Sequence, residues 1–191
     1  LPPRSMLIPY GTRPHARRGI WDDVWLYARA PVFVEDVFVK TSVREKTLTL
    51  DITLRNDTGG PVSALVENEV FDGWRRVLSL PRKSVRIPPH GSVKLTVSKR
   101  WPNPRLWWPF DPHLYRLRTA LLVGGREVDE VQTRFGFREI WIDGPNYRLN
   151  GRIFKLFGLG CAPIGMSRER IRRWFSERLS LIHISEPTRP R

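Results

Sequence analysis

Apolar and polar residues alternate along the middle of the chain, which is the pattern of strands with one buried face. The alternation starts at about Val34, is regular between Leu48 and Arg55, and returns at intervals as far as Phe135. This two-residue period predicts strands rather than helices. The predicted strands cover residues 37–42, 48–55, 62–71, 77–80, 93–98, 115–123 and 128–135.

Turn signals separate these strands. The clearest are residues 56–61, Asp72-Gly73, Pro88–Ser92 and Gly124-Gly125-Arg126, of which the last joins two strands as a hairpin. About seven short strands with turns between them, over roughly 100 residues, are typical of an immunoglobulin-like sandwich. The pattern therefore predicts an all-β fold, with an immunoglobulin-like β-sandwich over residues 36–137.

The two flanks of this region differ from it. Residues 1–35 contain five prolines, which disfavour a long helix, and include one candidate strand at Ile20–Tyr27. After Phe137, short strands are predicted at 140–143, 147–149 and 153–157, and Asn150-Gly151 between the last two favours a type I′ turn.

A helix is predicted to begin at Ser167, whose hydroxyl can cap the first turn. Ile171, Trp174 and Phe175 follow at the spacing that places apolar side chains on one helix face. A strand followed by a helix, after an all-β domain, is how a (β/α) barrel begins.

The formal net charge of +14 favours anionic partners, but its distribution argues against a nucleic-acid site. The basic residues are spread along the chain, and only six are lysines. Many fall at solvent-facing strand positions, as Arg116 and Arg118 do around Leu117. We therefore expect no nucleic-acid partner, and no apolar run reaches the roughly 20 residues of a membrane helix.

Metal and cofactor chemistry finds no support in the sequence. Cys161 is the only cysteine, so no internal disulfide is expected. His15, His90, His113 and His183 are scattered singly and lack the spacing of metal ligands. We expect no metal and no cofactor.

The carboxylates do not form a convincing catalytic pair. Two carboxyl groups that act on one bond, one as acid and one as nucleophile, must converge to about 5–5.5 Å. Asp22 and Asp23 are adjacent and would point to opposite faces of a strand. Glu67 and Glu69 share a face of a sandwich strand with no evident pocket. A third group, Glu127, Asp129 and Glu130, lies beside a hairpin, where a solvated edge is expected, so no catalytic residue is assigned in this chain.

Three segments resemble the middle of a glycoside hydrolase family 2 enzyme, the group that holds β-galactosidases, β-mannosidases and β-glucuronidases. They are Gly19–Leu26, the aromatic-proline corner Leu106–Tyr115, and Arg134–Ile140. The resemblance implies a jelly-roll sugar-binding domain before the sandwich and a catalytic (β/α)8 barrel after it. It assigns residues 1–35 to the end of the jelly-roll and residues 138–178 to the first strand and helix of the barrel.

The aromatic corner allows two interpretations. Exposed Trp107 and Trp108 rings could stack on sugars, or the corner could pack with Tyr115 as part of the sandwich. We favour packing, since in the resembling family this pattern belongs to the sandwich domain.

Residues after Asn150-Gly151 are similar to the family segment that leads into the first barrel strand and a sugar-binding Arg-Gly-x-Asn-x-His stretch. Here Phe157, Gly160 and Ala162 stand where the family has Arg, Asn and His. This departure suggests a divergent subfamily. Residues 179–191 resemble translated sequencing-adapter DNA from a metagenomic assembly, and we expect them to be an artefact outside the fold.

The sequence therefore predicts a non-catalytic fragment of a retaining glycoside hydrolase from carbohydrate metabolism. Its sandwich would act as a scaffold between domains, and the glycoside substrate would bind to the missing barrel of the parent enzyme. The alternative is a stand-alone carbohydrate- or protein-binding β-sandwich.

Overall fold

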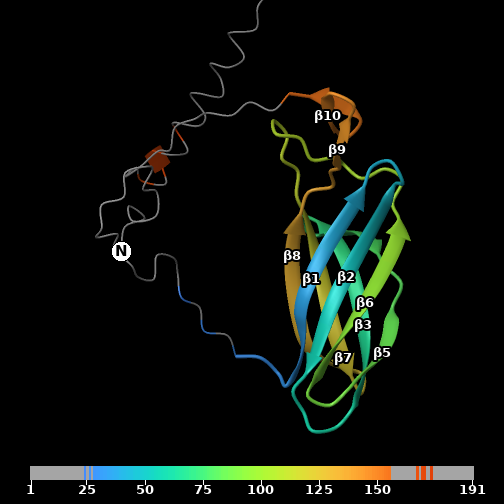
Figure 1. The fold of residues 1–191 in the computed structure, drawn as a ribbon. Helices are drawn as coiled ribbons and strands as arrows, with labels where there is room; N and C mark the ends of the chain where they lie inside the picture. The colour runs from blue at the N-terminus through green and yellow to red at the C-terminus, as the bar shows by residue number, and fades with distance from the viewer. Residues whose placement is uncertain are drawn as a thin grey trace, which may run out of the picture. The chain divides into compact units, whose positions relative to one another are not determined.

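The structure is a computed structural model that describes Val24, Leu26, residues 28–155 and four positions from Ser167 to Arg173. Most of the candidate strand Ile20–Tyr27 and of the predicted jelly-roll remnant lies outside the described residues, as does the tail 179–191. Residues Tyr27–Leu156 form one compact unit, which carries every strand of the described part (Figure 1).

Eight strands make up the sandwich, and three short strands follow it. The sandwich strands are β1 (Val32–Ser42), β2 (Thr47–Asn56), β3 (Val62–Asp72), β4 (Arg75–Ser79), β5 (Lys83–Ile87), β6 (Gly91–Arg100), β7 (Tyr115–Val123) and β8 (Arg126–Phe135). The strands that follow are β9 (Ile140–Asp143), β10 (Asn146–Leu149) and β11 (Arg152–Phe154).

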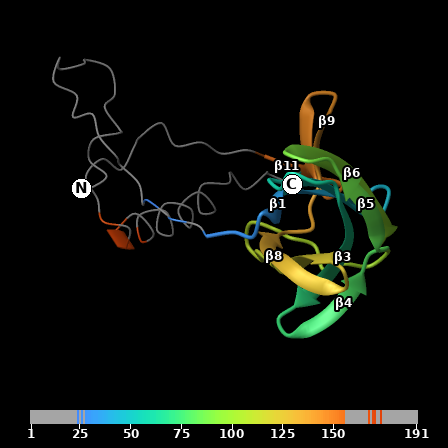
Figure 2. The same ribbon diagram turned by 90° about the horizontal axis from the view of Figure 1, so that it is seen from below.

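Two antiparallel sheets face each other, which confirms the predicted all-β sandwich. One sheet has the order β1-β2-β6, and the other has the order β4-β3-β7-β8 with β5 also paired to β3. Figure 2, which looks along the strands, shows the two sheets as separate layers. This distribution of strands between the sheets is that of an immunoglobulin-like fold.

β4 and β5 share one edge of β3. β4 pairs with Glu69–Asp72, and β5 pairs with Val62–Val66. Pro81 lies between β4 and β5, and a proline has no N–H to continue a ladder. The sequence predicted only one strand here, at 77–80, because β5 has just two inward-facing apolar residues, Val85 and Ile87.

The core consists of the inward-facing residues of both sheets. On β2 the alternate side chains of Leu48, Leu50, Ile52 and Leu54 are completely buried, as the two-residue period predicted. They meet buried residues of the facing sheet, namely Val66, Val70, Leu117 and Leu121. Each such side chain contributes roughly 1.5–3 kcal/mol through removal from water, so this core is the main source of stability.

The predicted turn at 56–61 is held by the buried side chain of Asn56. Its amide nitrogen donates to the carbonyl oxygens of Gly60 at 2.8 Å and Pro88 at 3.1 Å. Its amide oxygen accepts the N–H and the hydroxyl of Thr58. A single side chain thus fixes two turns at this end of the sandwich.

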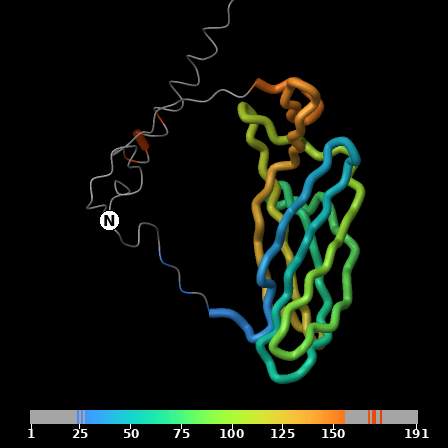
Figure 3. Tube along the Cα trace, in the orientation of Figure 1, coloured from blue at the N-terminus to red at the C-terminus, as the bar shows by residue number. Residues whose placement is uncertain are grey.

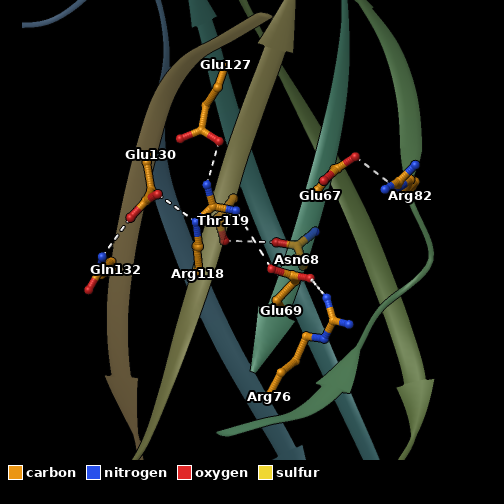
Figure 4. Close-up of polar contacts among 10 residues, drawn as sticks. All are labelled: Glu67, Asn68, Glu69, Arg76, Arg82, Arg118, Thr119, Glu127, Glu130 and Gln132. Atoms are coloured by element: carbon orange, nitrogen blue, oxygen red, sulfur yellow. Dashed lines mark hydrogen bonds and ion pairs between the residues drawn. The ribbon is translucent and has the colours of Figure 1, made fainter. Parts of the chain in front are cut away.

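A second polar group lies inside the core. The Thr119 hydroxyl donates to the Asn68 side-chain oxygen at 2.8 Å, and both residues are fully buried (Figure 4). The Asn68 Nδ2 group has no hydrogen-bond partner. A buried donor without a partner costs about 1–3 kcal/mol.

A side chain closes the seam between β1 and β8. The register of β1 on β2 shifts between Val34 and Asp36, which leaves Glu35 unpaired in a β-bulge. Beside the bulge, the N–H of Val34 donates to the carboxylate of Asp129 on β8 at 2.8 Å. Asp129, predicted to lie on a solvated edge, therefore joins the two sheets.

Tyr115 anchors the long connection between β6 and β7, which passes the end of the sandwich (Figure 3). Its hydroxyl accepts the N–H of Arg105 at 2.7 Å, in the manner of the tyrosine corner of immunoglobulin-like domains. Its buried ring contacts Trp101 and Phe135. Burial raises the pKa of the Tyr115 hydroxyl further above neutrality, where a tyrosine is already protonated.

The turns after the sandwich also follow the prediction. Asn150 and Gly151 have φ angles of 51° and 89°, the two positive values that a type I′ turn requires. They join β10 to β11, and Gly124 and Gly125 join β7 to β8 with positive φ as well.

The predicted helix start is visible in part. The hydroxyl of Ser167 accepts the N–H of Arg170 at 3.3 Å, the bond expected of an N-cap, and Glu169, Arg170 and Arg173 are helical. The residues of the predicted apolar helix face, Ile171, Trp174 and Phe175, lie outside the described residues. Within the described part, no helix has the length and apolar character to cross a membrane.

The Asn68–Thr119 pair gives a first prediction. Thr119→Val alone leaves the Asn68 oxygen without a donor, and we expect it to lower the free energy of unfolding by about 1–3 kcal/mol. Adding Asn68→Val removes both polar groups, so the double variant should be more stable than Thr119→Val. Urea unfolding followed by tryptophan fluorescence measures the cycle, and simple addition of two losses would contradict the prediction.

Candidate functional site

Glutamates on the outer face of the larger sheet, which the sequence singled out as candidates, form ion pairs with arginines. Glu67 pairs with Arg82 at 2.9 Å, and Glu69 pairs with Arg76 (Figure 4). Between the neighbouring strands, Arg118 reaches Glu69, Glu127 and Glu130. These acids therefore take part in ion pairs on an open sheet face.

Hydrogen bonds lower the pKa of two carboxyl groups on the sheet faces, Glu130 and Asp51. Hydrogen bonds from Gln132 and Arg118 hold the pKa of Glu130 below its usual value. On the other sheet, hydrogen bonds from Lys40 and Thr96 likewise lower the pKa of Asp51. A general acid for glycoside hydrolysis needs a raised pKa, so these two groups are suited to ion pairing instead.

The other carboxylates and the histidines considered in the sequence do not come together in one site within the described part of the chain. Asp129 accepts the N–H of Val34, and Asp22 and Asp23 lie outside the described residues. His113 packs edge-on against Tyr115, with Nε2 3.4 Å from Asp72 Oδ1 in a geometry that makes no hydrogen bond. His90 lies in a turn, and in the described part of the chain no three His, Cys, Asp or Glu side chains gather as metal ligands would.

The aromatic corner is packed against the chain that leaves the sandwich. Trp107 is half-buried, and its side chain lies so close to Gly136 that an added Cβ there would come within 2.7 Å of the ring. The backbone N–H of Trp107 donates to the carbonyl of Phe137 at 2.9 Å, and the Arg138 guanidinium lies over the Trp107 ring. Arg152 lies over Trp108 in the same way. The Trp107 and Trp108 rings, which could have stacked on sugars, are thus packed against other parts of the chain.

The most highly connected polar group at this end is the carboxylate of Glu139, just after the sandwich. It accepts the Ser42 hydroxyl and the backbone N–H groups of Val43 and Arg44, the latter two at 2.7 and 3.0 Å. The Arg44 guanidinium adds a hydrogen bond at 2.8 Å and an ion pair. Glu139 therefore ties the exit of the sandwich to the β1–β2 turn.

These contacts set the charge of Glu139. Burial alone would raise the pKa of its carboxyl group, but the hydrogen bonds from Arg44, Val43 and Ser42 outweigh burial and bring the pKa below its usual value. Glu139 is therefore ionised at neutral pH. It serves as a fixed acceptor for the turn and cannot act as a proton donor there.

Asn150 completes this arrangement from the other side. Its side-chain oxygen accepts the N–H of Glu139, and its own N–H donates to the carbonyl of Glu139, at 2.9 and 2.8 Å. Its amide nitrogen donates to the carbonyl of Trp107 at 2.9 Å. We name Glu139 and Asn150, with their partners Arg44 and Trp107, the exit clasp.

The exit clasp joins four segments that are far apart in the sequence. These are the β1–β2 turn, the aromatic corner, the residues after β8, and the β10–β11 turn. The clasp fixes the direction in which the chain leaves the sandwich. The sequence pattern marks Arg134–Ile140 and Asn150-Gly151 as separate features and does not predict that they meet.

The clasp leads to a second prediction. Glu139→Gln removes the charge that Arg44 and two N–H groups face, and we expect a loss of about 1–3 kcal/mol in the free energy of unfolding at neutral pH. Because the folded pKa of Glu139 is lowered, its stabilisation is present above the usual glutamate pKa and is lost as the pH falls through the folded pKa. The difference between the two proteins should therefore shrink in acid.

Urea unfolding of both proteins at about pH 7 and about pH 3 measures this difference. Glu45→Gln is the matched control, since Glu45 is an exposed carboxylate in the same turn. It should change stability by less than about 0.5 kcal/mol at either pH. A Glu139→Gln penalty that is independent of pH would show that the lowered pKa does not contribute.

The fold can be compared with that of known proteins. The structure is similar to that of a β-glucuronidase from Bacteroides uniformis, with a TM-score of 0.62 and 22% identity, over 76% of this chain and 20% of that one. A putative β-galactosidase from Bacteroides fragilis gives a TM-score of 0.58 at 24% identity, over 66% of this chain and 20% of that one. At these identities the similarity supports the fold.

The sequence also has curated relatives. A mannosylglycoprotein endo-β-mannosidase from Lilium longiflorum is 28% identical over 153 residues, which are 73% of this chain and 16% of the relative. A β-galactosidase from Streptococcus thermophilus is 31% identical over 141 residues, which are 72% of this chain and 13% of the relative. The chain thus spans less than a fifth of the length of these relatives. The family model described as glycosyl hydrolases family 2 matches residues 32–138, more than half of the chain. The chain belongs to glycoside hydrolase family 2.

Proposed function

We propose that this chain is a non-catalytic part of a longer retaining glycoside hydrolase, and that its sandwich serves as a scaffold between two domains. The observation that carries the proposal is the exit clasp, which fixes the outgoing chain to the sandwich through Glu139 and Asn150. Family membership and the small share of each relative that the chain spans support a longer parent protein.

The domain assignment belongs to the same proposal. Residues 1–35 would close a jelly-roll, residues 36–137 would form the scaffold, and residues 138–178 would open the catalytic barrel. The parent would hydrolyse an O-glycosyl bond of a β-linked sugar through two carboxylates supplied by that barrel. The relatives carry β-mannosidase, β-galactosidase and β-glucuronidase names, so the proposal stops at the β-glycoside class.

A rigid scaffold would matter for catalysis because the two carboxylates act only at a set separation. Misplacement of catalytic groups by about 1 Å can cost about a hundredfold in rate. A sandwich whose exit direction is fixed by hydrogen bonds on both sides would keep the flanking domains in register. This is a mechanical contribution, and it needs no reacting group within the sandwich.

One observation favours the alternative of a stand-alone binding module. Trp74, at the β3–β4 turn, is 92% exposed, and the Arg116 guanidinium lies over its ring. An exposed indole face can contact the apolar side of a sugar ring or a partner protein. One exposed residue supports the binding module less strongly than the clasp supports the scaffold. Trp74 therefore defines how the two functions can be told apart.

The third prediction compares the 191-residue chain with the protein encoded by the longer reading frame. With 4-nitrophenyl β-glycosides, we expect hydrolysis by the longer protein and no rate above background for the chain alone, because the paired carboxylates are proposed to lie in the barrel. Nuclear magnetic resonance of the first product should show the β-anomer, as retention requires.

Two results would count against the proposal. Hydrolysis by the 191-residue chain would mean that carboxylates within it react. A reading frame that stops without a barrel, combined with saturable sugar binding that Trp74→Ala removes, would support the binding module. Thr49→Ala is the control for that binding measurement. Thr49 bonds to Ser98 on the exposed face of the other sheet, so this variant leaves Trp74 and its strands unchanged.

A further inference from the structure

The outer face of the larger sheet carries a row of arginines beside aromatic rings, close to the β3–β4 turn. Phe71 on β3 lies opposite Arg76 on β4 and Arg116 on β7, and Arg116 in turn lies opposite Arg134 on β8. These four residues therefore share one face and form a row across the strands. Trp74 follows in the β3–β4 turn. We name Phe71, Trp74, Arg116 and Arg134 the arginine–aromatic patch.

The two arginines of the patch differ from the other arginines of this sheet. Arg76, Arg82 and Arg118 each pair with a glutamate (Figure 4). Among the residues that the structure describes, neither Arg116 nor Arg134 forms an ion pair with a carboxylate. Arg134 is exposed, and Arg116 is half-buried. The patch is therefore the place on this face where positive charge is left without a matching acid.

The pairing of Arg116 with Arg134 is unfavourable in the absence of an anion. The two residues lie directly opposite each other on neighbouring antiparallel strands. Like charges in such a pair repel each other and destabilise a sheet. An anion between them would replace that repulsion by two charge-assisted interactions. A local choice that works against stability is expected where a protein binds something.

The aromatic rings orient one of these arginines. The guanidinium of Arg116 lies over both rings, with its central carbon 5.4 Å from the centre of the Phe71 ring and 5.6 Å from the centre of the Trp74 ring. Stacking uses the flat face of a guanidinium and leaves its N–H groups, which lie in the plane, for other partners. One of them reaches the carbonyl of Gly73 at 3.5 Å, at the limit of a hydrogen bond. Arg116 is thus held in place with donors to spare.

We propose that the arginine–aromatic patch binds an acidic carbohydrate, with a sugar carboxylate held between Arg116 and Arg134 and a sugar ring stacked on Trp74. Paired guanidinium groups match a carboxylate, because each can donate two parallel hydrogen bonds to it. The Trp74 side chain is 92% exposed, so its indole presents apolar surface to the C–H face of a sugar ring. The fixed position of Arg116 reduces the entropy lost on binding.

The site is independent of the proposed scaffold role. Either a part of a longer enzyme or a stand-alone module could carry it. Binding of an acidic sugar to the patch does not decide between those two functions, which the reading frame distinguishes. Failure of the binding test would likewise leave the scaffold proposal unchanged.

The surroundings of the patch favour a short acidic sugar over a nucleic acid. A single-stranded nucleic acid is bound along a continuous positive groove that follows its backbone. Here the next row along β3, β7 and β8 consists of Glu69, Arg118 and Gln132, and Arg118 is already paired with Glu130. The unpaired positive charge therefore does not continue along these strands, and a ligand with few charges fits it better.

The test is a titration of the 191-residue chain with trigalacturonate and with its fully methyl-esterified form. The ester keeps the sugar rings and loses the charges. Nuclear magnetic resonance of the backbone amides of β7 and β8 follows binding. We expect saturable shifts around Arg116 and Arg134, and an affinity for the acid at least about fivefold higher than for the ester, because charge-assisted hydrogen bonds are stronger than neutral ones.

Three variants locate the ligand. Arg134→Gln should weaken binding of trigalacturonate by about tenfold or more through the loss of hydrogen bonds to a charged group. Trp74→Ala should weaken binding of the acid and of the ester alike, since both would stack on the indole. Arg82→Gln is the matched control, because it removes one exposed positive charge near the same face but outside the patch. It should change the affinity by less than about twofold, as screening limits the effect of a distant charge.

Two outcomes of the titration would overturn the proposal. One is equal affinity for the acid and the ester, or binding that Arg134→Gln leaves unchanged. The other is tighter binding of a single-stranded thymidine oligonucleotide than of trigalacturonate, lost in Arg134→Gln, which would assign the patch to nucleic acid.

Urea unfolding gives a second measurement on the same variants. Arg134→Gln should raise the urea midpoint of the free chain, because it removes the repulsion with Arg116. Saturating trigalacturonate should raise the midpoint of the unaltered chain and leave that of Arg134→Gln nearly unchanged. A lower midpoint for Arg134→Gln without ligand would contradict the proposal, since Arg134 would then stabilise the fold instead of waiting for an anion.

Discussion

The structure depends on one constraint, which is that alternate side chains of two sheets must be buried against each other. The leucines and isoleucine of β2 are completely buried, and the residues between them face outward. A shift of one residue in strand pairing would place that whole set in water. The turns therefore have to hold the register, and buried polar groups such as Asn56 and Tyr115 provide the fixed points.

The exit clasp extends this order beyond the sandwich. An end of a sandwich normally carries loops that can vary without affecting the core. Here the residues after β8 are bonded to the β1–β2 turn through Glu139 and to the aromatic corner through Asn150. A movement of β9 would therefore have to break several hydrogen bonds of the clasp together. This cooperativity is the reason that the proposed scaffold role rests on the end of the sandwich rather than on its faces.

Most of the fold could be predicted from the sequence, because strand alternation and turn chemistry are local. The β2 alternation, the Asn150-Gly151 turn and the Ser167 cap all follow from residues within a few positions of one another. The clasp could not be predicted, since the Glu139–Arg44 contact joins residues 95 positions apart. β5 was not predicted, because two inward-facing residues give an alternating pattern that is too short to identify a strand. The ion pairs of the carboxylates could not be predicted either, because the arginines that pair with Glu67, Glu69 and Glu130 come from other parts of the chain.

The seam between β1 and β8 has a consequence for behaviour at high concentration. A strand at the margin of a sheet offers free N–H and C=O groups to which another molecule can add its own strand. At β1, the bulge at Glu35 interrupts that row, and the Asp129 carboxylate occupies the N–H of Val34. An incoming strand would meet a kinked template and a negative charge. The chain thus carries its own protection against amyloid-like association on this side.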